Sequence, residues 1–386
     1  MLATLTNTPR DYAWGSATLI AALQGREPTG SPEAEVWFGD HPGSPALLGS
    51  DPAQAGRPLD AWLAEHGSGA LSYLLKLLAA ASPLSIQVHP SKEQAEIGYA
   101  AENAAGIPKD AAHRTYRDDN HKPEVIVALS DRFEALAGLR DLPATRRLID
   151  ALGQAHGVAE LRRRLDGDDP RAALGRTLAW LLSGDAQDAV DEVIAALEGA
   201  RSAEFEGELT AARRIAAAYP GDPGVVVALL MNHVVLARGE AIFVPAGVLH
   251  AYLQGLGVEI MAASDNVLRG GLTPKHIDVA ELLRIVDTRP SAPPRLVPRP
   301  VADGVEVFAP GIPDFELFRV RVDGAPRALA LHGAAIALAT AGRVSVSAGS
   351  DVVLELLPGS AAFATPDEAA LTIGGHGEVF IAQPGR

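Results

Sequence analysis

Cysteine is absent from this sequence of 386 residues, and its absence narrows the chemistry available to the protein. Without a thiol the chain forms no disulfide and no thiolate metal site. Any bound metal must therefore be held by histidine, carboxylate, amide or backbone ligands.

Long hydrophobic runs are also missing, although hydrophobic residues make up 47% of the chain. No run approaches the ~20 residues that a membrane span needs. The first residues, MLATLTNTPRDYAWGS, lack the basic region and the long apolar stretch of a signal peptide. We therefore expect a cytoplasmic protein with no membrane partner.

A basic stripe is the third missing feature, because the net charge is −15 and no segment concentrates Lys and Arg. This charge argues against a nucleic-acid partner. A phosphate group would have to be bound by a local basic pocket, because no long-range positive field attracts it. We expect a small-molecule substrate and a monomer.

The chain divides into zones of different composition, beginning with 1–140. In this zone LSIQVHP (84–90) and EVIVAL (124–129) are predicted strands. Between them, SKEQAEIGYAAEN (91–103) is typical of a helix, with Ser91 as its N-cap and a capping-box glutamine three residues later.

The middle of the chain is rich in alanine, and its leucines and valines recur at helical spacing. Strand character returns at VVVALLMNHVVL (225–236), a helix is expected over 273–287, and RPSAPPRLVPRP (289–300) indicates a linker. Short alternating runs after it predict a small all-β domain. The fold class is mainly β with an inserted α domain. The predicted parts are a discontinuous catalytic domain (1–140 and 221–289), a helical insert (141–220), a linker (290–300) and a C-terminal domain without metal (301–386).

Two side chains near residue 88 could hold a metal. In a strand, Gln87 and His89 face the same side, so one face offers an amide oxygen and an imidazole. Both bind divalent metals, and histidine favours zinc or another transition metal. A single strand histidine is more often structural, so this pair needs further ligands.

Glu124 opens the apolar strand 124–129, directly after Pro123, which suits a strand's first position. A carboxylate there is costly to bury unless it is paired or binds a cation. The alternative is that Glu124 lies at an exposed strand end and meets water.

The segment GEAIFVPAGVLH (239–250) combines Gly239, Pro245, Gly247 and His250 at a spacing that resembles the second motif of the cupin superfamily. Pro245 and Gly247 suit a tight turn between two apolar strands. The histidine would then point into a jelly-roll interior. Together with the earlier candidates, this gives one Zn²⁺ per chain with a position left open for water or substrate. The four proposed ligands are Gln87, His89, Glu124 and His250.

Cationic side chains cluster downstream in SDNVLRGGLTPK (264–275), where Arg269 and Lys275 are suited to binding phosphate. The adjacent glycines, Gly270 and Gly271, would let the backbone approach a ligand. A glycine-containing surface loop with solvated charges is the alternative. Lys76 stands alone within SYLLKLLAAA (72–81), where it either reaches the surface or lies buried near a site.

Several segments together resemble type I mannose-6-phosphate isomerase, a cupin-superfamily enzyme. YRDDNHKPE (116–124) fits the family signature, and HAYLQGLGVEIMAASDNVLRGGLTPKH (250–276) resembles its second long signature. LSIQVHPSKEQA (84–95) and EVWFGDHPGSPA (35–46) are similar to further family segments. Gly270 departs from the family's usual alanine, which affects local stiffness.

The resemblance implies a zinc-dependent aldose–ketose isomerase that interconverts mannose 6-phosphate and fructose 6-phosphate through an enediolate. It implies two cupin-like jelly-roll domains with a helical insert, and the same metal ligands as above. The expected catalytic residues are Arg269, Lys122, His121, Asp265 and Lys76, and the expected substrate-binding residues are Lys275, Lys92 and Glu259.

His121, Lys122 and Asp265 all remain candidates for the general base. Two other functions stay open: a metal cupin that binds sugar without catalysis, and a cupin-type metal dioxygenase. Dioxygenases usually carry two histidines in their first motif, whereas Gln87 occupies the first of these positions here. The C-terminal segment GSAAFATP (359–366) looks like a degenerate cupin turn without its histidine.

Overall fold

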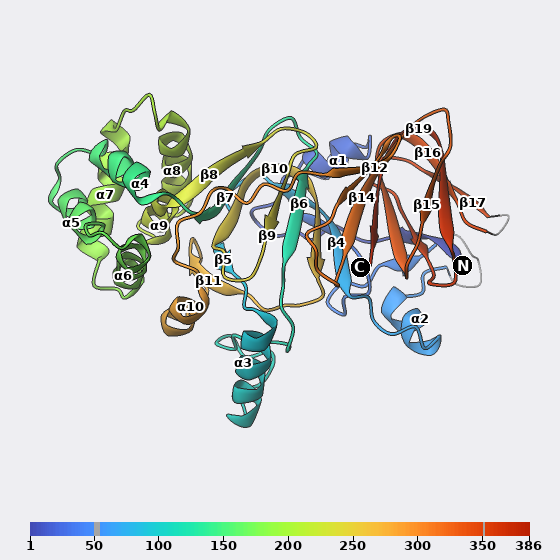
Figure 1. Ribbon diagram of the computed structural model, residues 1–386, viewed down its shortest axis with the longest axis horizontal. Helices are drawn as coiled ribbons and strands as arrows, with labels where there is room; N and C mark the ends of the chain where they lie inside the picture. Colours follow the sequence, from blue (N-terminus) through green and yellow to red (C-terminus); the bar gives the residue numbers. More distant parts are fainter. Residues whose placement is uncertain (50–54, 350–351) are drawn as a thin grey trace.

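The computed structural model describes residues 1–49, 55–349 and 352–386 of the chain. Two antiparallel sheets lie side by side, and a group of helices covers the far end of one of them (Figure 1). The mainly β class with an inserted helical segment is confirmed. No helix among the described residues is long and apolar enough to cross a membrane.

The first sheet is organised around one long strand, β10, which pairs with β4, β5, β6 and β7. Because four strands share this one partner, residues far apart in the sequence are brought to the two ends of β10. The strands of this sheet are β2 (Glu35–Phe38), β4 (Tyr73–Ala80), β5 (Ile86–Val88), β6 (Glu124–Ala128), β7 (Phe133–Leu139), β8 (Met231–Leu236), β9 (Ala241–Val244), β10 (His250–Ala262) and β11 (Leu268–Gly271).

The second sheet contains the C-terminal strands and also two strands from the start of the chain. Residues 2–6 were predicted to belong with the catalytic domain, but β1 pairs with β18, so this strand lies in the C-terminal sheet. The strands are β1 (Leu2–Thr6), β3 (Leu47–Leu48), β12 (Arg299–Ala302), β13 (Val305–Phe308), β14 (Glu316–Asp323), β15 (Arg327–Ala330), β16 (Ala335–Ser347), β17 (Val353–Leu356), β18 (Ala361–Ala364) and β19 (Ala370–Gln383).

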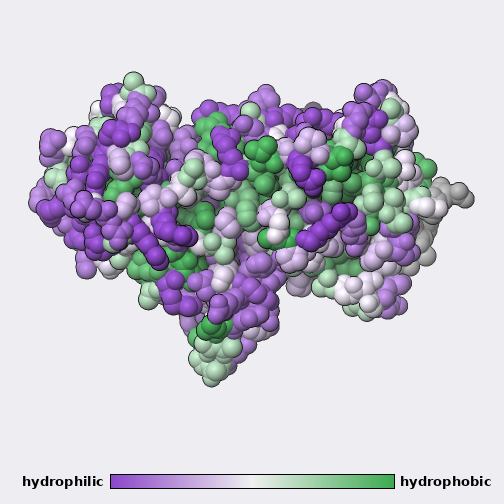
Figure 2. Space-filling view, in the orientation of Figure 1, coloured by the Kyte–Doolittle hydropathy of each residue, from purple (hydrophilic) through white to green (hydrophobic). Residues whose placement is uncertain are grey.

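The helical segment joins β7 to β8, and hydrophilic side chains gather over it in the surface view (Figure 2). It contains α4 (Leu142–Asp150), α5 (His156–Arg164), α6 (Pro170–Leu182), α7 (Gln187–Gly199), α8 (Glu206–Ala218) and α9 (Gly224–Leu230). Elsewhere lie α1 (Leu19–Leu23), α2 (Leu59–Glu65), α3 (Lys92–Ala104) and α10 (Val279–Ile285). The predicted α3 is confirmed, including the capping box of Ser91.

One strand prediction was wrong. Residues 225–230 form helix α9 instead of the start of a strand, and only 231–236 are extended. Every residue of α9 is buried, so the segment is apolar on all sides and shows no helical periodicity in the sequence. The helix predicted over 273–287 is confirmed only over α10 (Val279–Ile285).

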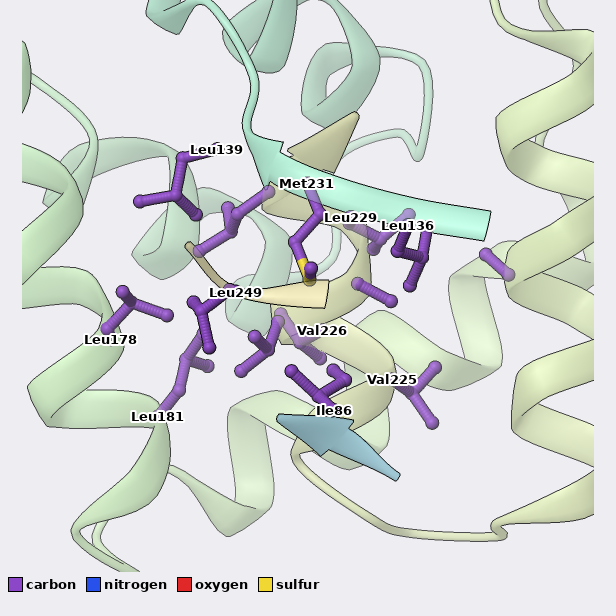
Figure 3. Close-up of a cluster of buried hydrophobic side chains, with 14 of the residues drawn as sticks. Ile86, Leu136, Leu139, Leu178, Leu181, Val225, Val226, Leu229, Met231 and Leu249 are labelled. Carbon is purple, nitrogen blue, oxygen red and sulfur yellow. The ribbon is translucent and has the colours of Figure 1, made fainter. Parts of the chain in front are cut away.

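A hydrophobic cluster attaches the helices to the first sheet (Figure 3). Ile86 and Leu249 reach into it from the sheet, and Leu178 and Leu181 meet them from α6. Because neighbouring side chains alternate in extended chain, the residues that follow Ile86 and Leu249 point toward the opposite face. The apolar contact therefore fixes the orientation of Gln87 and His250.

Candidate metal centre

Three predicted ligands meet in the first sheet. His89 Nε2 lies 3.2 Å from Glu124 Oε1, and His250 Nε2 lies 3.3 Å from Glu124 Oε2. One ligand atom from each side chain lies within 4.8 Å of those of the other two, and all three residues are buried. The carboxylate thus stands between two imidazoles.

Strand register brings further predicted residues to the same face. Gln87 of β5 stands opposite His250 of β10 and also opposite Arg269 of β11. Residues directly opposite in antiparallel strands project to the same side of the sheet. Gln87 therefore belongs to the face that carries His250, and Arg269 borders it.

Backbone carbonyls orient the two histidine rings. Nδ1 of His89 lies 2.7 Å from the carbonyl oxygen of Asn266, and Nδ1 of His250 lies 3.2 Å from that of Val248. A carbonyl only accepts hydrogen bonds, so each Nδ1 carries the proton and each Nε2 keeps its lone pair for a ligand. Burial lowers the pKa of His89 to about 4, which keeps this ring neutral at neutral pH.

Lys122 controls the charge of the central carboxylate. Burial alone would raise the pKa of Glu124, but Lys122 and His89 outweigh it and hold that pKa well below its ordinary value. The Lys122 ammonium lies 3.0 Å from Glu124 Oε1. Glu124 is therefore an anion, as a metal ligand must be.

A second charged group lies farther along β10. Lys76 of β4 is buried, 3.2 Å from Glu259 and 3.8 Å from Glu35, and its ammonium lies over the ring of Trp37. The surface alternative for Lys76 was thus wrong. Burial would lower the pKa of Lys76, but the two carboxylates raise it. Burial raises the pKa of Glu259 to about 7, because Lys76 only partly offsets it.

Three cations gather beside β11 without carboxylate partners. Burial lowers the pKa of Arg269, and Arg117 lowers it further. Burial, Arg269 and Arg117 lower the pKa of Lys275 in the same way. Among the residues that the structure describes, none of these three side chains forms an ion pair with a carboxylate. The chain as a whole has more acidic than basic residues. Mutual repulsion of this kind favours a bound anion.

The comparisons with known proteins agree with this geometry. Residues 2–142 match the model of the phosphomannose isomerase type I catalytic domain. The chain is 37% identical to mannose-6-phosphate isomerase of Escherichia coli, over 97% of both chains. The chain belongs to the type I phosphomannose isomerase family.

Further members are similar over most of their length. The human mannose-6-phosphate isomerase is 31% identical, with 88% of this chain and 87% of the human protein covered. A zinc-bound crystal structure of mannose 6-phosphate isomerase is 34% identical and superimposes with a TM-score of 0.90, covering 100% of each chain. The phosphomannose isomerase fold therefore extends over both sheets and the helical segment.

The residues of this site fit a zinc ion. His89 Nε2 is buried and has no hydrogen-bond partner among the described residues, which is costly unless an ion binds there. Two imidazoles and one carboxylate are ligands that zinc prefers, and Gln87 on the same face would supply a fourth. Zinc is thus the expected cofactor.

The signature turn before β6 is ordered by Asp118. Its carboxylate accepts hydrogen bonds from Ser264 Oγ (2.8 Å), the Asp265 backbone (2.7 Å) and Asn266 Nδ2 (3.1 Å). Asn266 also holds His89 through its carbonyl oxygen. Asp118 therefore ties the two family signatures together, a role that the sequence did not reveal.

Three predicted site residues have other partners. His121 Nε2 lies 2.9 Å from Asp314, and Lys92 donates to the backbone oxygen of Asp119 at 2.8 Å. Asp265 lies 3.0 Å from His41, and this hydrogen bond lowers the pKa of Asp265. These contacts do not bring His121 or Lys92 to the metal ligands.

The glycine pair after Arg269 serves packing. Gly270 and Gly271 lie in strand β11 instead of a surface loop. A Cβ on Gly271 would come within 2.4 Å of the Gly224 Cα, so the close approach is to helix α9 and not to a ligand. Sequence reasoning also missed Tyr252, whose hydroxyl lies 3.4 Å from Glu124, and Arg117.

Proposed function

We propose that the chain interconverts mannose 6-phosphate and fructose 6-phosphate by moving a proton between C1 and C2 through an enediolate. The observation that carries the proposal is the buried group of His89, Glu124 and His250 beside a cluster of unpaired cations. When bound, zinc would supply a positive charge close to the sugar oxygens. A cytoplasmic location and a monomeric state remain part of the proposal.

The cation cluster would bind the phosphate group. Lys275 was expected to do so. Arg269, expected to be catalytic, and Arg117 lie in the same cluster, because both lower the pKa of Lys275. Lys92 is a weaker candidate, since its ammonium already contacts Asp119 and Glu96. Charge-assisted hydrogen bonds from arginine and lysine to phosphate are strong and directional.

The proton transfer requires a group that both accepts and donates near neutral pH. Glu259, with its pKa raised to about 7 by burial, meets this requirement. The Lys122 ammonium forms an ion pair with Glu124 at 3.0 Å, and the hydrogen bond from His41 lowers the pKa of Asp265. We therefore infer that Glu259 transfers the proton, with Lys122 as a fixed cation.

The pH dependence of kcat/KM tests the role of Glu259. A base must be deprotonated, so kcat/KM should rise with pH through the pKa of Glu259, which a neighbouring divalent cation would move below 7. Glu259→Gln should remove this limb and lower kcat by about 10²–10⁴-fold. An unchanged limb in the variant would assign the proton to another residue.

A coupled assay on mannose 6-phosphate tests the function as a whole. Isomerisation that stops on zinc removal and returns on zinc addition supports the proposal. A sugar-binding cupin would bind mannose 6-phosphate without turnover, and a dioxygenase would consume oxygen. The family membership favours the isomerase over both.

A further inference from the structure

A residue that precedes a strand of the C-terminal sheet contacts the segment that carries the active-site side chains. Asp314 lies in the loop before β14, and its carboxylate contacts His121 at 2.9 Å. The side chains of His121 and Asp314 are 23% and 11% exposed, so the contact is largely shielded from water. A hydrogen bond in such a place holds its geometry better than one at an open surface.

The backbone of Asp314 makes a second contact in the first sheet. Its carbonyl oxygen accepts a hydrogen bond from Ser72 Oγ at 2.7 Å. Ser72 directly precedes β4, and His121 lies three residues before β6. Asp314 thus touches the entry to both strands.

These two strands flank β10 at the same end of the sheet. Tyr73 of β4 stands opposite Ala262, and Glu124 of β6 stands opposite Met261. Asp314 therefore connects the segments that precede β4 and β6, the two strands that pair with this end of β10.

The alternation of side chains explains how this contact affects the metal centre. In extended chain, successive side chains point to opposite sides. Lys122 and Glu124 face each other at 3.0 Å, and His121 faces away from them toward Asp314. Holding His121 outward keeps Lys122 and Glu124 inward.

We propose that Asp314 is a positioning residue for catalysis: by holding His121 it fixes the orientation of Lys122 and Glu124. His121, expected to be catalytic, then acts through its neighbours. This inference rests on the proposed isomerase function. It gives the C-terminal sheet a role in the reaction at a distance from the substrate.

Replacing the carboxylate alone tests the proposal, because the bond from Ser72 to the backbone of residue 314 is retained. Asp314→Leu removes the acceptor, and kcat should fall about tenfold, as for residues that orient ligands from outside. KM and the zinc content should stay within twofold of wild type. Asp314→Asn keeps an oxygen acceptor and should recover most of the lost kcat.

A double-mutant cycle keeps the test valid if one variant is unstable. His121→Leu alone should lower kcat as much as Asp314→Leu, and the double variant should be no worse than either. Asp323→Leu is the matched control, since this aspartate of β14 has an 83% exposed side chain, and its kcat should be unchanged.

Several outcomes would overturn the proposal. One is a folded, zinc-loaded Asp314→Leu with wild-type kcat, and another is an equal loss in Asp314→Leu and Asp314→Asn. Fully additive losses in the cycle would also count against it. An inactive wild-type enzyme would instead contradict the proposed function, so the two failures are distinguishable.

Discussion

The two sheets share one strand–turn–strand arrangement, but their side chains differ. Gly239 with φ 85° leads into β9, and Gly359 with φ 82° leads into β18. Eleven residues after each glycine a long strand begins, β10 at His250 and β19 at Ala370. The same backbone thus presents an imidazole in one sheet and a methyl group in the other.

The difference continues along the two long strands. Glu259 is buried in β10 beside Lys76, whereas Val379 occupies the corresponding place in the apolar core of β19. Among the described residues, the only group of histidines and acids placed to hold a metal lies in the first sheet. The same backbone arrangement can therefore carry a metal site or an apolar core, depending on the side chains at these positions.

Replacing His250 should make the first sheet resemble the second, which has an alanine at the corresponding position. His250→Ala takes one of the two imidazoles from Glu124, so bound zinc should be lost and kcat should fall more than ~100-fold, beyond the range for residues that only support ligands. Zinc content by elemental analysis and turnover of mannose 6-phosphate measure both. Full zinc occupancy with normal turnover would remove His250 from the ligand set.

Removing a cation beside the centre should separate binding of zinc from catalysis. Arg269→Ala should retain zinc, while kcat falls about 10²–10³-fold, as when one stabilising donor is lost. Arg321→Ala, at a 55% exposed position of the second sheet, is the control and should leave kcat unchanged. A rise in KM alone would restrict Arg269 to substrate binding.

Replacing the corresponding glycine should destabilise the protein in either sheet. A Cβ added at residue 239 would lie 2.3 Å from the Arg319 side chain, and a Cβ added at residue 359 would lie 2.5 Å from the Gln24 side chain. The left-handed backbone costs a further ~1–2 kcal/mol for any L side chain. Gly239→Ala and Gly359→Ala should each lower the free energy of unfolding measured in urea. An effect in only one sheet would contradict the shared arrangement.

Adding a histidine to the second sheet should have the smallest effect on zinc content and kcat. Ala370→His places an imidazole where β19 begins, but a metal site needs several ligands, and among the described residues the only group of histidines and acids placed to hold a metal lies in the first sheet. Zinc should stay at one ion per chain and kcat within twofold of wild type. A second bound zinc would show that the C-terminal sheet retains a latent site.

Three of the candidate metal ligands could be predicted because each lies in a short segment whose residue types point to its role. Pro245 and Gly247 define a turn that delivers His250, and Glu124 opens an otherwise apolar strand. The structure brings His89, Glu124 and His250 together as this reasoning required. The fourth ligand, Gln87, stays a prediction supported by strand register.

The partners of the predicted residues could not be read from the sequence. His121 and Asp314 are separated by 193 residues, and His41 and Asp265 by 224, so only tertiary packing joins them. Helix α9 was misassigned because it is buried on all sides and its valines favour strands. β1 was misplaced because strand pairing over such a distance leaves no local signal.

The pairing of β1 with β18 also sets the order of events during synthesis. Leu2 to Leu5 lie opposite Ala364 to Ala361, so β1 must wait for the synthesis of β18 before it can pair. At ~5–20 residues per second, that wait is about 20–70 s on the ribosome. During it, Ala3 and Leu5, which end in the protein's core, lack their final partners. A contact between segments so far apart in sequence forms later than a contact between neighbouring strands, and the waiting strand is exposed to chaperones and to misassembly for longer.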